Sequence, residues 1–481
     1  MITACKSCPF SMRPRISSAV LSIGMALAIL AGTSATSQAV PLLVGPPVKT
    51  SELTEKIVEA ILNHGETWSN LGSFVSKGPR LCGSTGADQA VDWAKSRLTS
   101  YGFERISTQS VKVPHWVRGT REVASITSGA SPVSLRVTAL GQSAGTPAGG
   151  IEAEVVEVKS LDEVRKLGSK LRGKIVFYNR PMNPAMANTF EAYGAAVDQR
   201  SSGPALAARN GAVATLVRSM TTLADDAHPH TGITFFGNTN PIPAAAISTH
   251  DANVLAGQLQ GRAPVRVRLE LSAKRLPDTT SYNVMGEITG AEIPQEIVLV
   301  GGHLDSWDLS SGAHDDGAGV VQSIEVLRAF KALGLRPKRT VRVVLFMCEE
   351  FGGIGAEEYA AAAKSRSENH IFATESDRGG FRAEGFSIEN ASPAALKKIQ
   401  GWAPYLASLQ ATSIIAGSSG TDVEPLNELG AVTLDLLTES RHYFDFHHSD
   451  LDEMQVVNPK ELSQGAAALA VITFLAADQG L

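Results

Sequence analysis

The sequence contains little cysteine, few aromatic residues and no strong excess of charge of either sign. Four of its 481 residues are cysteine, and phenylalanine, tyrosine and tryptophan together make up 6%. Two of the cysteines fall in an N-terminal leader, and the remaining pair is too small for a cysteine-based zinc framework. Any bound metal must therefore be held by histidines and carboxylates. The formal net charge of −5 gives no reason to expect nucleic acid or an anionic membrane as a partner.

Long hydrophobic runs are also missing, because no segment approaches the ~20 apolar residues of a membrane-spanning helix. One shorter apolar run follows basic residues and precedes a small-residue motif, as in an export signal: Lys6, Arg13 and Arg15, then residues 19–31, then Ser37-Gln38-Ala39. We therefore expect residues 1–39 to be a signal peptide that is cleaved after Ala39. The mature protein would be secreted or periplasmic, with no stable membrane span. A start at Met12, which begins a more typical signal, stays open.

The mature chain keeps two cysteines, Cys82 and Cys348. In an exported protein they could form a disulfide. Their wide separation in the sequence favours two buried free thiols instead.

The length favours about two domains besides the leader, and the character of the sequence changes along the chain. Residues 50–103 are predicted to be helical, with an amphipathic helix over Ala87–Leu98. Residues 111–276 contain short strands between glycine and proline turns, and from Ser281 onward strands and helices alternate. Such alternation is typical of an α/β protein with a mixed, mainly parallel sheet sandwiched by helices.

Individual elements follow from hydrophobic periodicity and from capping residues. Asn458 is a suitable helix N-cap and Pro459 suits the first turn, so the last helix is predicted to begin there. The other predicted helices lie near residues 320–330 and 354–363, and the predicted strands are 135–138, 173–178, 214–217, 266–269, 282–288, 296–300, 341–347, 371–375 and 432–436.

Four groups of polar residues follow predicted strands or lie in loops of the last section. They are His303, Asp305, Asp315 and Asp316; Glu349 and Glu350; Glu375-Ser376-Asp377; and the loop Tyr443–Asp450. Taken singly, each has an ordinary structural interpretation, such as a helix N-terminus or a surface turn. Together they supply nitrogen and oxygen ligands at one edge of a sheet, which is where α/β proteins bind ligands. Such a set suits zinc, and a carboxylate that bridges two ions is typical of two-metal hydrolysis.

Further motifs extend over nearly the whole mature chain: Arg80-Leu81, Gly83-Ser84, Val113-Pro114-His115-Trp116, Pro229-His230-Thr231-Gly232, Gly302–Trp307, Gly334–Thr340, Gly173–Val176 and Ile242–Ala244. With the strand-end residues, they resemble the aminopeptidase Y and glutamate carboxypeptidase family of co-catalytic zinc exopeptidases. The resemblance implies a zinc exopeptidase fold with an inserted β-rich protease-associated domain, and it implies a homodimer. The implied parts are a signal peptide (1–39), the N-terminal part of the peptidase domain (40–112), the protease-associated-like insert (113–276) and the zinc peptidase catalytic domain (277–481).

The resemblance also implies two zinc ions per subunit and assigns their ligands position by position. The implied ligands are His303 and Asp377 for one ion, Glu350 and His448 for the other, and Asp315 as the bridge. His447 competes with His448 for its place, and the family pattern of histidine followed by serine favours His448. A cis peptide bond is expected between Asp315 and Asp316.

The remaining roles follow from the same likeness. Glu349 would be the general base, which takes a proton from water and later delivers it to the leaving amine. Asp305 would orient His303 by accepting its other ring N–H. The substrate pocket would be lined by Ser419, Gly420, Thr421, Tyr443 and Phe444. No residue is identified that recognises a terminal charge of the substrate.

The sequence thus predicts an exported di-zinc exopeptidase that hydrolyses dipeptides or short peptides with free termini. Trimming from the amino end, trimming from the carboxyl end and cleavage of dipeptides alone stay open. Two alternatives also stay open: a single-zinc cyclase or amidohydrolase of related fold, and a non-catalytic binding module. Metal stoichiometry separates the two enzyme classes, and an absence of tightly bound zinc would favour the binding module.

Overall fold

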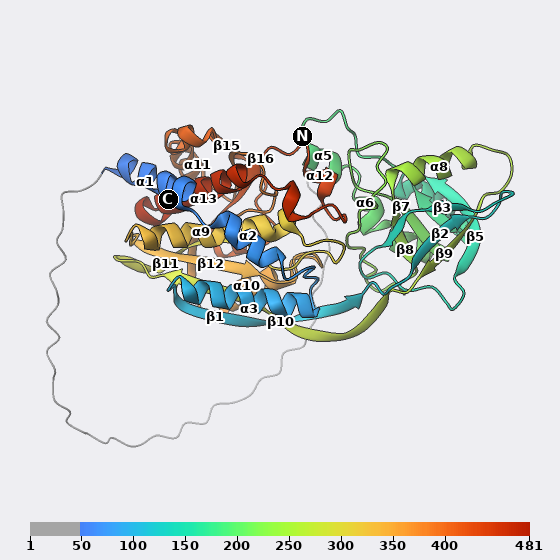
Figure 1. Cartoon of the computed structure of the whole chain (residues 1–481), viewed down its shortest axis with the longest axis horizontal. Helices are drawn as coiled ribbons and strands as arrows, with labels where there is room; N and C mark the ends of the chain where they lie inside the picture. Colours follow the sequence, from blue (N-terminus) through green and yellow to red (C-terminus); the bar gives the residue numbers. More distant parts are fainter. Residues whose placement is uncertain (1–48) are drawn as a thin grey trace, which may run out of the picture. The chain divides into compact units, whose positions relative to one another are not determined.

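The computed structural model describes residues 49–481, whose strands form two sheets of eight strands each (Figure 1). The predicted leader, its cleavage after Ala39 and the alternative start at Met12 lie outside these residues. Within the described part of the chain, no helix is long and apolar enough to cross a membrane.

The first sheet has a parallel centre. In spatial order its strands are β1 (Glu104–Val117), β10 (Lys274–Ile288), β12 (Arg339–Phe346), β11 (Ile293–His303), β13 (Asn369–Glu375), β16 (Val432–Thr438), β14 (Ala383–Glu389) and β15 (Ser413–Ala416). β12, β11, β13 and β16 run parallel, whereas β10 joins β12, and β14 joins β16, in antiparallel fashion. The predicted mixed α/β fold is confirmed.

Helices cover both faces of this sheet because its central strands are apolar on both sides. Val298 and Val300 of β11 pack into one core cluster, whereas Leu299 packs with Tyr359 into a second cluster on the opposite face. The helices that follow or precede these strands are α1 (Thr50–His64), α2 (Thr67–Val75), α3 (Thr85–Ser100), α9 (Ala318–Ala332), α10 (Ile354–Ser365), α11 (Pro393–Gln400), α12 (Tyr443–Phe446) and α13 (Pro459–Gln479).

Side chains cap the first turn of three of these helices, and at α11 the Ser392 hydroxyl accepts the N–H of Ala395. The Ser84 hydroxyl accepts the N–H of Ala87 at the start of α3. The Asn458 side chain accepts the N–H of Lys460 at the start of α13, with Pro459 in the first turn, which confirms the predicted start of the last helix. α13 is buried along most of its length, so it forms part of the core rather than an amphipathic cover.

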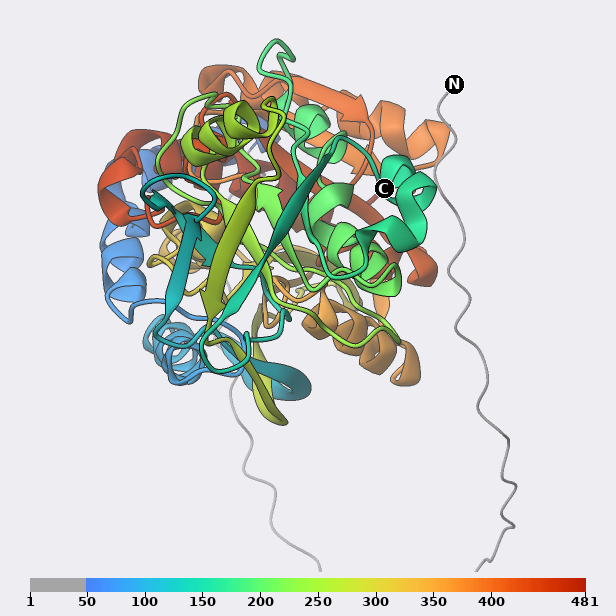
Figure 2. The ribbon, with the colours of Figure 1, turned by 90° about the vertical axis from the view of Figure 1, so that its right-hand side faces the viewer.

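The second sheet lies within residues 122–271, between β1 and β10 in the sequence. Its strands, in spatial order, are β3 (Val133–Leu135), β2 (Glu122–Ile126), β9 (Arg266–Leu271), β5 (Ile151–Val158), β6 (Ile175–Tyr178), β7 (Ala214–Arg218), β8 (Ala244–Ile247) and β4 (Val137–Ala139) (Figure 2). The associated helices are α4 (Leu161–Leu167), α5 (Thr189–Gly194), α6 (Asp198–Ser201), α7 (Gly203–Arg209) and α8 (Thr249–Leu259).

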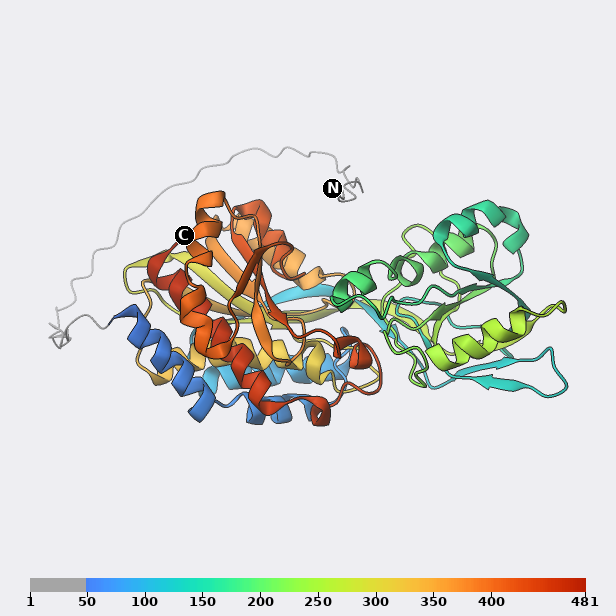
Figure 3. The ribbon, with the colours of Figure 1, turned by 90° about the horizontal axis from the view of Figure 1, so that it is seen from above.

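Two long antiparallel strands connect this segment to the first sheet. β1 and β10 pair from Glu104 with Glu287 to Val117 with Lys274, so the chain enters and leaves the second sheet side by side. α4 and α8 cover opposite faces of the second sheet, as Figure 3 shows and as their membership of different core clusters requires.

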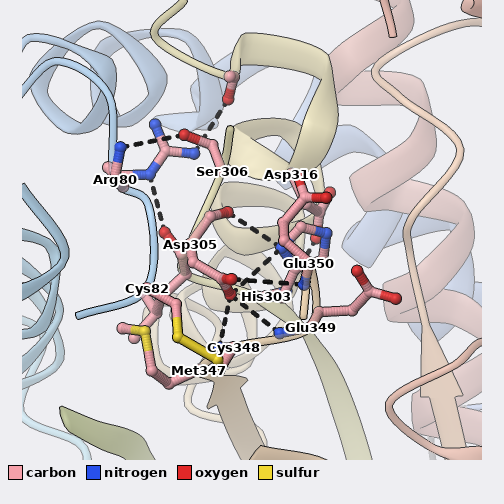
Figure 4. A network of polar contacts seen from close by, with 12 residues as sticks. Arg80, Cys82, His303, Asp305, Ser306, Asp316, Met347, Cys348, Glu349 and Glu350 are labelled. Atoms are coloured by element: carbon pink, nitrogen blue, oxygen red, sulfur yellow. Dashed lines mark hydrogen bonds and ion pairs between the residues drawn. A yellow bond between two sulfur atoms is a disulfide. The ribbon is translucent and has the colours of Figure 1, made fainter. Parts of the chain in front are cut away.

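A disulfide joins Cys82, in the turn before α3, to Cys348, which follows β12. The prediction of two free thiols is therefore wrong. Although 266 residues separate the cysteines in sequence, the fold brings their Cα atoms to 5.1 Å. The bond attaches the N-terminal helices directly to the segment that continues into Glu349 (Figure 4).

Candidate metal centre and active site

Polar residues follow three adjacent parallel strands at the edge where these strands end. β11 ends at His303, β12 is followed by Glu349 and Glu350, and β13 is followed by Asp377. The strand ends are level, because His303 is in register with Phe346 of β12. The prediction that these residues share one edge of one sheet is confirmed.

Asp315 is brought to the same edge by a short irregular turn before α9. Its backbone N–H donates to the Asp452 carboxylate at 3.0 Å, and the N–H of His314 donates to the same carboxylate at 2.7 Å. The following Asp316 accepts the N–H of His303 at 3.0 Å. The peptide bond between Asp315 and Asp316 is cis, as the family resemblance implied.

The two carboxylate oxygens of Asp315 face two different pairs of side chains. Its Oδ1 lies 3.2 Å from Nε2 of His303, and that same nitrogen lies 3.5 Å from Oδ1 of Asp377. Its Oδ2 lies 3.2 Å from Nε2 of His448, which is in turn 3.1 Å from Oε2 of Glu350. The structure thus gathers all five predicted metal ligands into two groups that share one aspartate.

Without a bound cation, ionisation of these buried, closely spaced carboxylates is unfavourable. Burial and the nearby Asp315 carboxylate raise the pKa of Glu350 to about 7, and burial also raises the pKa of Asp377. Burial opposes ionisation of Asp315 too, but contacts with His303 and His448 hold its pKa well below the ordinary value. The site therefore concentrates carboxylates that only positive charge can stabilise in their ionised form.

Unpartnered atoms support the same conclusion. Among the described residues, Nε2 of His303, Oε1 of Glu350 and Oδ1 of Asp377 are buried without a hydrogen-bond partner. Buried polar atoms are normally satisfied, and these three belong to the predicted ligands. One imidazole and one carboxylate on each side of a shared carboxylate are nitrogen and oxygen donors that zinc accepts, so the residues present fit the predicted metal.

Asp305 organises the site through both its carboxylate and its backbone carbonyl. Its carboxylate accepts the backbone N–H groups of Cys348 at 2.7 Å, Glu349 at 3.1 Å and Glu350 at 3.4 Å (Figure 4). Nδ1 of His303 instead donates to the Asp305 backbone carbonyl at 3.0 Å and is 3.7 Å from the carboxylate. The carbonyl, not the carboxylate, therefore orients His303, because the carboxylate holds the end of β12.

His447 and His448 stack with their ring centroids 3.5 Å apart, but they differ in their distances to the carboxylates. Nε2 of His447 is 3.8 Å from Asp315 Oδ2, farther than Nε2 of His448, and only His448 also contacts Glu350. His448 has a φ of 61°, a left-handed conformation that non-glycine residues adopt mainly where a site demands it. The distances favour His448 as the ligand.

Comparison with known proteins agrees with this geometry. Residues 283–473 match the model of "Peptidase family M28". Carboxypeptidase Q of Mus musculus is 37% identical over 435 residues, which cover 88% of this chain and 90% of the relative. The chain belongs to peptidase family M28. The family resemblance and the prediction of a zinc metallo-exopeptidase are thereby confirmed.

Other M28 relatives extend the likeness. Carboxypeptidase Q of Homo sapiens is 37% identical over 404 residues, covering 83% of each chain. The crystal structure of a peptidase M28 precursor from Shewanella amazonensis SB2B has a TM-score of 0.84 and 34% identity, and the match covers 90% of this chain and 97% of that one. An aminopeptidase from Aneurinibacillus sp. strain AM-1, at 20% identity and a TM-score of 0.63, shares the fold.

The predicted metal centre faces a cavity of about 330 Å³. The residues that line this cavity differ in part from those predicted for the substrate pocket. Thr421, Tyr443 and Phe444 line it as predicted. Ser419 does not, because its hydroxyl and N–H both donate to Glu389. Gly420 packs against the Glu375 side chain and is also absent from the lining. Glu349 lines the cavity together with the predicted ligands Asp315, Glu350, Asp377 and His448.

The segment between β1 and β10 supplies five further lining residues, which the sequence did not reveal. These residues are Phe190, Tyr193, Arg200, Ile233 and Phe235. They belong to no recognisable catalytic motif. The one available signal was the Pro229–Gly232 motif, together with the ionisable residues beside it.

The Pro229–Gly232 motif contacts the loop Tyr443–Asp450, which carries His447 and His448. Nδ1 of His230 donates to the His447 carbonyl at 2.7 Å, and its Nε2 lies 3.2 Å from Oδ2 of Asp226. The N–H of Thr231 donates to the His448 carbonyl at 2.8 Å. His230 is fully buried, so the second-sheet segment helps to fix the backbone on which His448 is mounted.

Proposed function

We propose that this M28 peptidase holds two zinc ions per chain and hydrolyses dipeptides or short peptides with free termini. The observation that carries the proposal is the placement of Asp315, whose two oxygens face separate pairs of ligands. His303 and Asp377 would hold one ion, and Glu350 and His448 the other. Such a shared carboxylate is expected of a two-metal hydrolase and argues against a single-zinc amidohydrolase.

Bound zinc, Glu349 and Asp305 have separate roles in the proposed hydrolysis. When bound, zinc supplies Lewis acidity, which polarises the scissile carbonyl and makes water a stronger nucleophile at neutral pH. Glu349 acts as the general base: its carboxylate takes a proton from the attacking water and later donates it to the leaving amine. Without a bound metal ion, burial and the Asp377 carboxylate raise the pKa of Glu349 well above its ordinary value. Asp305 fixes the backbone of Glu349 and so directs its side chain.

The proposal includes the organisation of the whole protein. Residues 40–112 and 277–481 form the peptidase domain, and residues 113–276 form a protease-associated-like insert, which the separate second sheet supports. Export with cleavage after Ala39 and assembly into a homodimer rest on the leader sequence and on the family resemblance. N-terminal sequencing of the exported protein and sedimentation of the purified protein test these two parts.

The experiment that tests the activity is hydrolysis of a panel of unblocked and N-acetylated dipeptides by the zinc-loaded mature protein. We expect release of free amino acids from unblocked dipeptides. A Glu349→Gln variant serves as the matched control, because it keeps the five proposed ligands and loses the proposed base. Failure to cleave any dipeptide would reject the dipeptidase activity and favour the cyclase or binding alternatives.

A further inference from the structure

Arg200 lies in the active-site cavity without a carboxylate partner. It belongs to α6 in the second-sheet segment and lines the same cavity as Asp315, Glu349 and His448. Only 4% of its surface is exposed. The cavity therefore contains a buried cation beside the cluster of catalytic carboxylates.

The hydrogen bonds of Arg200 leave much of its guanidinium unused. Nη1 donates to the Thr231 carbonyl at 3.3 Å, and Nη2 donates to the Tyr193 hydroxyl at 2.7 Å. A guanidinium has five N–H groups, and in the described part of the chain no other acceptor bonds to this one. Its Nε is buried with no partner.

Two other buried arginines pair with carboxylates, whereas Arg80 and Arg218 donate to carbonyl and amide oxygens. Arg118 pairs with Glu122 and Asp308, and Arg342 pairs with Glu287 and Glu368. A buried charge without a counterion is strongly unfavourable. A cavity that retains one is therefore a candidate binding site for an anion.

The surroundings of Arg200 are built to hold its guanidinium in place. A side chain at Gly232 would collide with Nη1, Nε and Cζ of Arg200, and Gly232 has a φ of 138°, which only glycine adopts readily. The Tyr193 ring contacts the His447 ring at a centroid distance of 5.5 Å, and His447 stacks on His448. Two ring contacts thus connect the arginine to a proposed metal ligand.

The geometry points to Arg200 as the group that binds the α-carboxylate of the peptide substrate. This inference rests on the proposed function and adds the terminus that the enzyme recognises. Guanidinium groups bind carboxylates through paired, charge-assisted hydrogen bonds. The cavity volume of about 330 Å³ is at the lower end of the roughly 300–1,000 Å³ of small-molecule sites. Such a cavity suits a dipeptide whose carboxylate lies on Arg200 and whose peptide bond lies beside Glu349.

The test compares a dipeptide with its C-terminal amide as substrates of the zinc-loaded full chain. The variants are Arg200→Met, Arg200→Lys and the control Arg209→Met, an exposed arginine on the neighbouring helix α7. In the wild type we expect the free carboxylate to be preferred. Arg200→Met should lower kcat/KM for the dipeptide by about 10- to 100-fold, lower kcat/KM for the amide much less and leave the zinc content unchanged. Arg200→Lys should retain part of the preference, and Arg209→Met all of it.

A binding measurement separates this inference from the proposed function. Calorimetry on the Glu349→Gln protein, with and without Arg200→Met, gives dipeptide affinity without turnover. A loss of affinity for the dipeptide but not for its amide supports the inference, even if no hydrolysis is found. The inference is overturned if the wild type has equal kcat/KM and equal affinity for the dipeptide and its amide. It is also overturned if Arg200→Met lowers these values equally for both compounds. If Arg200→Met does not fold, the wild-type and Arg200→Lys comparisons still decide.

Discussion

Arg80 anchors the loop that carries three proposed site residues, and its replacement should weaken both the fold and the metal centre. The side chain is fully buried. Its Nε donates to the Leu304 carbonyl at 2.8 Å, Nη2 donates to the Gly312 carbonyl at 3.0 Å, and Nη1 donates to the Ser311 carbonyl. Burial lowers its pKa to about 10, so the guanidinium remains charged at neutral pH.

The size of the effect follows from these bonds. Arg80→Met loses the cation–π contact with Phe74, whose ring centroid lies 4.3 Å from the guanidinium carbon. It also leaves the buried carbonyls of Leu304 and Ser311 without donors, whereas the Gly312 carbonyl keeps the N–H of Gly317. Each such group costs about 1–3 kcal/mol, and removing the buried charge offsets part of the sum. We expect the free energy of unfolding to fall by about 3–5 kcal/mol. For a protein of this size, that corresponds to a decrease in Tm of roughly 3–5 °C.

Zinc affinity should fall as well, because the carbonyls that Arg80 holds lie within residues 303–315, the segment that carries His303, Asp305 and Asp315. Substitution of groups that orient metal ligands typically costs 10- to 100-fold in affinity. Thermal unfolding of the metal-free protein and zinc titration against a chelating dye measure the two effects separately. Arg262→Met, at an exposed position, is the matched control. A variant that keeps wild-type Tm and wild-type zinc affinity would refute the reasoning.

Three further predictions follow from individual contacts. Glu349→Gln should lower kcat by about 10²- to 10⁴-fold with no change in zinc content; similar activity in both proteins would exclude Glu349 as the base. Replacing both Cys82 and Cys348 with serine opens a loop of 266 residues and should lower the free energy of unfolding by about 2–5 kcal/mol, as measured by urea denaturation; an unchanged midpoint would contradict this. Burial and Arg342 lower the pKa of His370 from 6.5 to about 4. Between these values the unfolded chain binds a proton that the folded chain does not, so the free energy of unfolding should fall by up to about 3 kcal/mol as the pH drops from 6.5 to 4. His370→Phe should flatten this pH dependence, and an unaltered slope would show that other groups cause it.

The strand-end residues were predictable because they are local to strongly apolar strands. His303, Glu350 and Asp377 each follow a strand that its hydrophobic run identifies, and parallel strands end at one edge of a sheet. The assignment of these residues as ligands also needed the family resemblance. The sequence pattern alone indicates a metal site, but it does not say which glutamate faces the metal.

Long-range pairings were not predictable from the same patterns. No local sequence pattern around Cys82 or Cys348 predicts that their Cα atoms lie 5.1 Å apart. β1 was missed because most of its residues are exposed or half-buried, so it lacks an apolar run. The predicted strand 135–138 is divided at Arg136, whose backbone N–H donates to the Asp251 carboxylate rather than to a neighbouring strand.

The residues that line the cavity from the second-sheet segment could not be predicted from local sequence patterns either. Arg200 and Tyr193 lie in short helices without a catalytic motif, and they reach the centre only because β1 and β10 carry the second sheet beside it. Asp305 was predicted to accept the ring N–H of His303, and its backbone carbonyl does so, which leaves its carboxylate for another role. The structure uses that carboxylate for the backbone of residues 348–350, a role that depends on where β12 ends in space.

The central claim is that Asp315 joins two metal sites, and the zinc content of the purified protein tests it most directly. Elemental analysis after dialysis against metal-free buffer should give two zinc ions per chain. Asp377→Ala should lower the content toward one, and Asp315→Ala should lower it further, because both groups of ligands share this carboxylate. A wild-type protein that holds one zinc ion, unchanged in Asp377→Ala, would contradict the account.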